Sequence, residues 1–252
     1  MNNIVLVNDR RERIALWTSR QFCGLIAVCL TLCAVSHTAA QSTVFNIAST
    51  DVLPAHQAYL EADFLAHLSS YESGGFQTYG PRIVYGLGRR TEVGVNVFYT
   101  RMSPAEPMEI QPNFKWKFYE NEGRGLAAAV GVVISIPITE RALEPIRGLV
   151  YAVGSKNLPG TFGARLTAGS YALLGSFEQG TSKKGLLLGY EQPVSKRLTF
   201  ITDWSSGNND YGYLAAGAAI ALSPKSVFYV GYNVGNQGRG NNSLGLYYGF
   251  TF

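Results

Sequence analysis

The stretch TEVGVNVFYT at residues 91–100 alternates between two kinds of side chain. From 93 to 99 the odd positions are three valines and a tyrosine, whereas positions 92, 94 and 96 are Glu, Gly and Asn. Successive side chains of a strand point to opposite faces, so this period of two predicts a strand with one apolar and one polar face. The stretch IQPNFKWKF at 110–118 repeats the pattern, with aromatic residues alternating with asparagine and lysine.

The same reading outward along the chain predicts twelve strands, joined alternately by short and longer connections. The predicted strands are 58–69, 76–86, 91–101, 109–119, 125–137, 147–156, 161–173, 183–192, 197–206, 211–222, 226–235 and 243–252. Most have about ten residues, which suits a tilted strand that crosses a bilayer. An even number of strands is typical of single-chain bacterial outer-membrane barrels. We therefore predict a transmembrane antiparallel up-and-down β-barrel at 58–252, with the longer connections 102–108, 138–146 and 174–182 gating its mouth.

Composition narrows the class of protein. The chain is 46% hydrophobic and 15% charged, so it is neither disordered nor an ordinary soluble domain. A net charge of +4 is too small to indicate a nucleic-acid partner. The predicted outer face carries aromatic residues near strand ends, as a membrane interface favours. These residues are Tyr79, Tyr85, Tyr99, Trp116, Tyr151, Tyr190, Trp204, Tyr232 and Tyr248.

The opposite face mixes ionisable and very small side chains. A sealed protein core would be destabilised by so many charges, whereas a wet lumen tolerates them. We therefore predict that these residues line the lumen and the path of a small solute. They are Glu61, Asp63, Arg82, Glu92, Lys115, Lys117, Arg165, Glu191 and Asp203.

The two ends of the chain carry signals of export and assembly. Residues 1–20 hold four arginines, 22–35 are apolar and 36–40 are mostly small, which is the layout of a signal peptide cleaved before Gln41. All three cysteines lie in this segment. Residues 41–57 would then be a periplasmic lead-in or a partial plug. The alternating aromatic residues Tyr248, Phe250 and Phe252 resemble the terminal signature that the barrel-assembly machinery reads in outer-membrane proteins.

Little in the sequence indicates catalysis. No metal-ligand spacing or nucleophile motif is present, and we predict no cofactor, metal or catalytic residue. His67 shares its predicted inward face with Glu61 and Asp63, which leaves a lipid-acting outer-membrane hydrolase as an alternative. A structural barrel with a plugged lumen is a further alternative.

Several stretches are similar to one family of barrels. These are STDVLP at 49–54, YLEADF at 59–64, YGLGRRTEVGVNVFY at 85–99, QPNFKWKFY at 111–119 and VISIPIT at 133–139. They resemble the meta-pathway phenol-degradation family of bacterial outer-membrane β-barrel transporters, most closely over the first five predicted strands. The resemblance implies uptake of small molecules, aromatic ones among them, and no catalytic residues. The sequence therefore favours an outer-membrane channel for small, aromatic or hydrophobic solutes, whose partners are membrane lipid, the assembly machinery and the solute.

Overall fold

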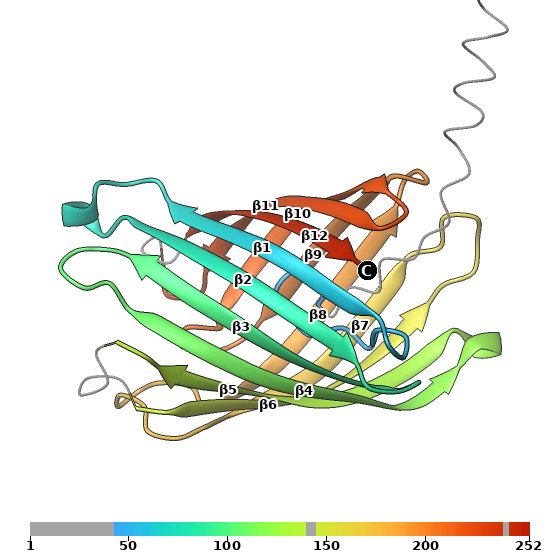
Figure 1. Ribbon diagram of the computed structural model, residues 1–252, viewed down its shortest axis with the longest axis horizontal. Helices are drawn as coiled ribbons and strands as arrows, with labels where there is room; N and C mark the ends of the chain where they lie inside the picture. Colours follow the sequence, from blue (N-terminus) through green and yellow to red (C-terminus); the bar gives the residue numbers. More distant parts are fainter. Residues whose placement is uncertain (1–42, 140–144, 239–241) are drawn as a thin grey trace, which may run out of the picture. The chain divides into compact units, whose positions relative to one another are not determined.

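Twelve antiparallel strands close into one barrel in the computed structural model, which describes residues 43–139, 145–238 and 242–252. Each strand pairs with its neighbours in the chain, and β1 pairs with β12 (Figure 1). The strands are β1 (Ala58–His67), β2 (Phe76–Gly86), β3 (Thr91–Arg101), β4 (Met108–Asn121), β5 (Leu126–Pro137), β6 (Arg147–Asn157), β7 (Arg165–Leu174), β8 (Lys184–Pro193), β9 (Leu198–Ser205), β10 (Tyr213–Ser223), β11 (Ser226–Gly235) and β12 (Ser243–Thr251). The predicted fold class and strand number are confirmed.

The strand bounds differ most from the prediction at β7, which begins at Arg165 rather than at 161. Residues 158–164 form a tight turn instead, in which the Leu158 amide donates to the Ala164 carbonyl at 2.8 Å. The turn contains Pro159 and Gly160, and Gly160 has a φ of 130°. Proline and glycine favour turns over regular strands, which explains the shorter strand.

Closure leaves the sheet without an edge. The register between β1 and β12 runs from Tyr59 opposite Thr251 to Ala66 opposite Leu244, and the Phe252 amide donates to the Ala58 carbonyl at 2.8 Å. The connections at the end where β1 begins hold two to seven residues, and we call this the short-turn end. Those at the opposite end, the long-loop end, hold six to nine residues. Loops 102–107 and 175–183 lie at the long-loop end, as does 138–146, of which 140–144 fall outside the described residues.

The outer wall of the barrel is apolar and exposed. Its side chains include Leu60, Ile83, Phe114, Trp116, Leu166, Leu186, Leu188, Phe200 and Tyr248, each at least 40% exposed. An apolar surface of this extent is costly in water and suits hydrocarbon, as in transmembrane barrels. Among the described residues, no helix has the length and apolar character needed to span a membrane.

One aromatic residue lies on the opposite face from the one predicted. Tyr151 was assigned to the outer wall, but it points inward and is 9% exposed. It shares its face of β6 with Val153 and Ser155, which are also buried. The apolar character of tyrosine suits either face, so the alternation along the strand is the better guide to its direction.

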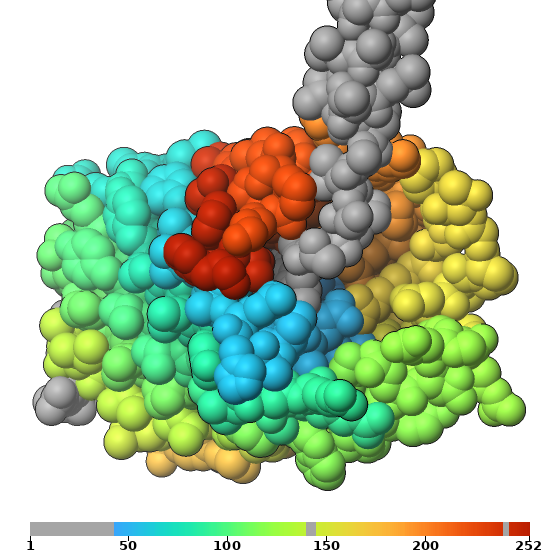
Figure 2. All heavy atoms as spheres, turned by 45° about the vertical axis from the view of Figure 1, so that its right-hand side comes forward, coloured from blue at the N-terminus to red at the C-terminus, as the bar shows by residue number. Residues whose placement is uncertain are grey.

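The first described residues lie inside the barrel, where they form hydrogen bonds with residues of β3, β4, β6, β7, β9, β11 and β12. We call Thr43–Ala48 the tip and Ser49–Leu53 the anchor. Phe45 of the tip is 3% exposed and Leu53 of the anchor is 1% exposed. Figure 2 shows where the blue-coloured part of the chain reaches the surface, between the red C-terminal strand and segments coloured green and yellow. The prediction for 41–57 left a lead-in and a partial plug open; in the structure, 43–53 fill the short-turn half of the lumen.

Two glycines of the wall make room for the tip. A Cβ atom on Gly231 of β11 would lie 2.5 Å from the Phe45 ring, closer than any real contact. A Cβ atom on Gly189 of β8 would lie 3.2 Å from the side chains of both Val44 and Ile47. Glycine in a strand often marks such a close approach, and here it forms a recess in the inner wall.

Candidate functional site

A chamber of about 300 Å³ lies inside the barrel above the tip. The floor of the chamber is formed by four tip residues, Thr43, Asn46, Ile47 and Ala48. Residues of the long connection 206–212 line the other end of the chamber. Its walls carry many aromatic side chains: Tyr59, Phe98, Tyr151, Tyr171, Tyr211, Tyr213 and Tyr247. The tyrosine content of the chain therefore serves the interior as well as the outer wall.

One wall of the chamber is made of amides. On β3 and β4, Asn96 donates to Gln111 at 3.3 Å and Asn113 donates to Asn96 at 3.4 Å. These side chains point inward because they alternate with the apolar outer residues seen in the sequence. Amides offer both donors and acceptors without net charge, so this wall can orient a polar group of a solute.

Phenol hydroxyls also line the chamber. Tyr247 donates to the Asn46 side chain at 3.0 Å, and Tyr59 donates to Glu61 at 2.5 Å. In the long connection, burial raises the pKa of the Tyr211 phenol above its usual value, so this group is neutral at pH 7. The chamber thus combines ring faces for apolar contact with neutral polar groups for recognition.

A buried ion triad lies in the wall between β1 and β2. Arg82 lies 3.3 Å from Glu61 and 2.6 Å from Asp63, measured between charged atoms, and Phe98 covers its guanidinium at 5.6 Å. The two carboxylates are 3% and 4% exposed. Residues 61 and 82 face each other in the strand register, which places one arginine between two acids two residues apart on the same face.

Asp203 of β9 holds the tip through its backbone. One carboxylate oxygen accepts the amides of Phe45, Asn46 and Ile47 at 3.0, 2.6 and 2.9 Å. Asn46 also donates to Asn233 at 2.9 Å, and the Phe45 ring packs edge-on against Tyr247. Consecutive backbone amides that converge on one anion form strong, charge-assisted hydrogen bonds.

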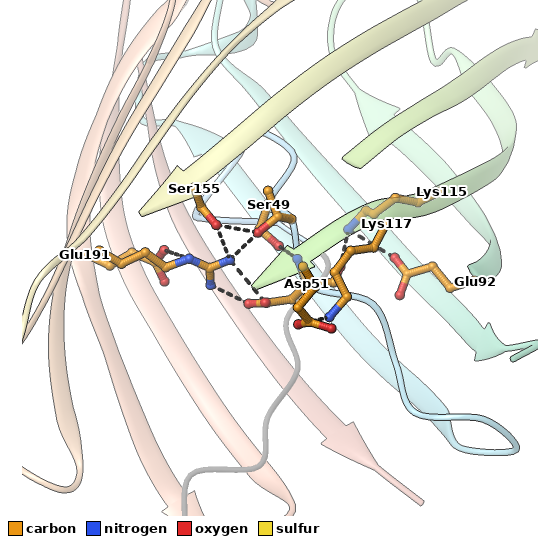
Figure 3. Close-up of polar contacts among 10 residues, drawn as sticks. Ser49, Asp51, Glu92, Lys115, Lys117, Ser155 and Glu191 are labelled. Carbon is orange, nitrogen blue, oxygen red and sulfur yellow. Dashed lines mark hydrogen bonds and ion pairs between the residues drawn. The ribbon is translucent and has the colours of Figure 1, made fainter. Parts of the chain in front are cut away.

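The anchor is held by two basic residues of the wall (Figure 3). Arg165 forms a bidentate pair with Asp51, and its Nε lies 3.7 Å from Glu191. Lys115 lies 3.1 Å from Glu92 and donates to the Asp51 carbonyl at 2.8 Å. These contacts join the anchor to strands β3, β4, β7 and β8.

Further hydrogen bonds join the anchor to the wall. Glu92 accepts the Leu53 amide at 2.8 Å, and the Thr50 and Ser155 hydroxyls lie 2.6 Å apart. Glu92 and Lys115 are 1% and 2% exposed, so their charges are satisfied by each other and by the anchor rather than by bulk water. The anchor and the wall therefore form one continuous polar network.

The nine predicted lumen residues all occupy the interior, but they lie in four separate places rather than along one continuous lining. Glu61 and Arg82 border the chamber and Asp63 lies behind them. The anchor is surrounded by Glu92, Lys115, Arg165 and Glu191, and the tip is bound by Asp203. Lys117 lies at the short-turn end, where its ammonium group is 2.5 Å from the Glu120 carboxylate. Their place on a solute path stays a prediction. The sequence prediction of a lead-in or partial plug at 41–57 contained the tip and the anchor but none of their contacts. It did not predict the chamber tyrosines, although alternation along β6 would have placed Tyr151 inside.

The predicted grouping of His67 with Glu61 and Asp63 does not form. Both acids bind Arg82, and four residues of strand separate His67 from Asp63, about 13 Å along β1. His67 Nδ1 instead lies 2.6 Å from the Asn242 carbonyl, and its Nε2 lies 3.0 Å from the exposed Ser69 hydroxyl. No group of three or more His, Cys, Asp or Glu residues that could hold a metal occurs in the described part of the chain.

Comparison with known proteins supports the fold. No protein-family model and no curated protein matches the chain. Its structure is similar to the COG4313 outer membrane channel from Pseudomonas putida F1, with 13% identity and a TM-score of 0.51 over 81% of this chain and 98% of that one. It is also similar to Acinetobacter baumannii outer membrane protein Omp33, with 11% identity and a TM-score of 0.50 over 78% of this chain and 98% of that one. At these identities the likeness concerns the barrel fold, and membership of the phenol-degradation family stays a prediction.

Proposed function

We propose that the chain is a channel of the bacterial outer membrane through which small, aromatic or hydrophobic solutes pass passively. The observation that carries the proposal is the chamber, a space of about 300 Å³ inside a closed barrel whose outer wall is apolar. Ligand sites are typically concave and mostly apolar, with a few polar groups that fix orientation. The chamber has this character, since tyrosine rings line it together with the amides of Asn96, Gln111 and Asn113.

The charge distribution supports an uncharged solute. Of the chamber's lining residues only Glu61, Arg82 and Asp210 are ionisable as acid or base, apart from the phenols. Each has an opposite charge nearby, since Glu61 pairs with Arg82 and Asp210 lies 3.3 Å from Arg147. A charged solute would therefore meet no unpaired countercharge among these side chains, whereas aromatic faces and amides favour a neutral ring.

The outer-membrane location rests on the wall and on the chain ends. We propose that 1–40 is a signal peptide removed on export, and that Tyr248, Phe250 and Phe252 are read by the assembly machinery. In the structure Tyr248 and Phe252 are 45% and 62% exposed, and the Phe250 and Phe252 rings lie 4.9 Å apart at the seam with β1. An exposed aromatic cluster at the closing strand is accessible to a partner during insertion.

A flux assay tests the channel. The processed protein is reconstituted into liposomes, and influx of benzyl alcohol and of glucose is compared with that into protein-free liposomes. Leu149→Trp narrows the chamber and should slow influx severalfold, whereas Leu188→Trp on the outer wall is the matched control and should not. Absence of protein-dependent flux of any small solute through the folded barrel would refute the proposal.

The filled short-turn half of the lumen favours a second candidate, a structural barrel without transport. The anchor and tip close this half through Asp203, Arg165 and Lys115. The same assay decides between the two, since a structural barrel gives no flux in any variant.

A further inference from the structure

We propose that the tip is a gate, that Asp203 is the residue that holds it shut, and that the anchor is its hinge. The inference rests on the proposed channel function and assigns a moving part to it. In this mechanism Thr43–Ala48 leaves the wall while Ser49–Leu53 stays bound. The floor of the chamber then opens toward the short-turn end.

Three backbone contacts of the tip pass through one side chain. The tip has no charged residue of its own, and three of its backbone amides converge on the single carboxylate of Asp203. Asn46 adds neutral hydrogen bonds with Asn233 and Tyr247. Loss of the charge at Asp203 would therefore weaken three contacts at once.

The anchor is held differently. It contributes its own charge, Asp51, which binds Arg165, and its backbone is bonded independently by Lys115 and Glu92. These contacts lie on three strands, β3, β4 and β7, and involve none of the residues that hold the tip. Because the anchor lies between the tip and β1 in the chain, the tip can move away without disturbing either the anchor or the barrel closure.

The tip is also where a solute would act. The chamber floor consists of the tip residues Thr43, Asn46, Ile47 and Ala48, so a molecule in the chamber would contact the tip directly. The wall opposite the tip is recessed at Gly189 and Gly231. Because tip side chains occupy these recesses, departure of the tip leaves free space along this wall.

Single-cysteine labelling tests the gate without relying on transport. All three cysteines of the chain lie within 1–40, so a processed variant carries one introduced cysteine. Val44→Cys reports on the tip and Ser49→Cys on the anchor; these positions are 0% and 1% exposed. Each is placed in the wild-type, Asp203→Asn and Glu191→Gln backgrounds in liposomes and labelled with a polar maleimide. Glu191→Gln is the matched control, because it also removes the charge of one inward-facing acid, but Glu191 binds Arg165 and not the tip.

Asp203→Asn should raise the labelling rate of Val44→Cys at least tenfold and leave Ser49→Cys protected, whereas Glu191→Gln should leave Val44→Cys protected. Unchanged labelling of Val44→Cys in Asp203→Asn would overturn the role of Asp203. Labelling of both cysteines would overturn the hinge, since the whole segment would then leave. If Asp203→Asn fails to fold, Gly189→Leu replaces it, because the new side chain would displace Val44 and Ile47 from the wall. If Val44→Cys is labelled in the Asp203→Asn background but no solute crosses the membrane, the motion of the tip is supported and the channel function is refuted.

Discussion

Arg82 should be among the most costly side chains of the barrel to remove, because it neutralises two acids. Glu61 and Asp63 are 3% and 4% exposed and lie 3.3 and 2.6 Å from its guanidinium. Removing one partner of a buried ion pair typically costs about 3–5 kcal/mol, because the remaining charge is left uncompensated. The Arg82 side chain is 20% exposed on the chamber side, so water can partly replace it. We therefore expect Arg82→Ala to lower the free energy of unfolding by about 3 kcal/mol, at the lower end of that range.

Urea unfolding of the protein in lipid vesicles, followed by tryptophan fluorescence, measures this change. Arg101→Ala is the control, since Arg101 and Glu106 lie 4.0 Å apart and are 58% and 55% exposed. An exposed pair of this kind contributes about 0–1 kcal/mol. A loss below about 1 kcal/mol for Arg82→Ala, equal to that of the control, would refute the reasoning and indicate a lumen wet enough to solvate both acids.

Further variants test the anchor, the chamber and assembly. Arg165→Ala should expose the anchor, because Asp51 loses its bidentate partner, and labelling of Ser49→Cys should rise several-fold; an unchanged rate would mean that Lys115 suffices. Tyr151→Ala should enlarge the chamber and accelerate solute influx into liposomes, and a slower influx would show that the ring binds the solute rather than obstructing it. Phe252→Ala should reduce the amount of barrel assembled in the outer membrane, measured as folded protein in membrane fractions. Equal amounts of variant and wild type would exclude the terminal aromatic residue as an assembly signal.

The wall of the barrel could be predicted from the sequence because the pattern that marks each strand lies within a few consecutive residues. The bounds of β2, β3 and β11 agree with the predicted 76–86, 91–101 and 226–235. In each strand the lipid face and the lumen face alternate residue by residue, so a short window contains the whole signal. The interior position of the nine charged residues followed from the same alternation.

The pairing of those residues could not be predicted in this way. Alternation places Asp203 inside the barrel, but its partners are amides 156 to 158 positions away in the chain. The link between Tyr247 and Asn46 spans 201 positions. Residues 43–53 form no strand, so no periodic signal marks them, and their place depends on the recess that Gly189 and Gly231 form after closure.

The amino-acid sequence was enough to predict an antiparallel barrel of twelve strands with an apolar outer wall and an inner wall of charged and small residues. The content of the lumen became known only from the folded structure. Once β1 pairs with β12, the tip and anchor are enclosed and the inner charges bind one another and this segment. The chamber above the tip is the space that remains. The physical reason is that a strand's two faces depend on neighbours in the sequence, whereas the content of a lumen depends on contacts that exist only after closure.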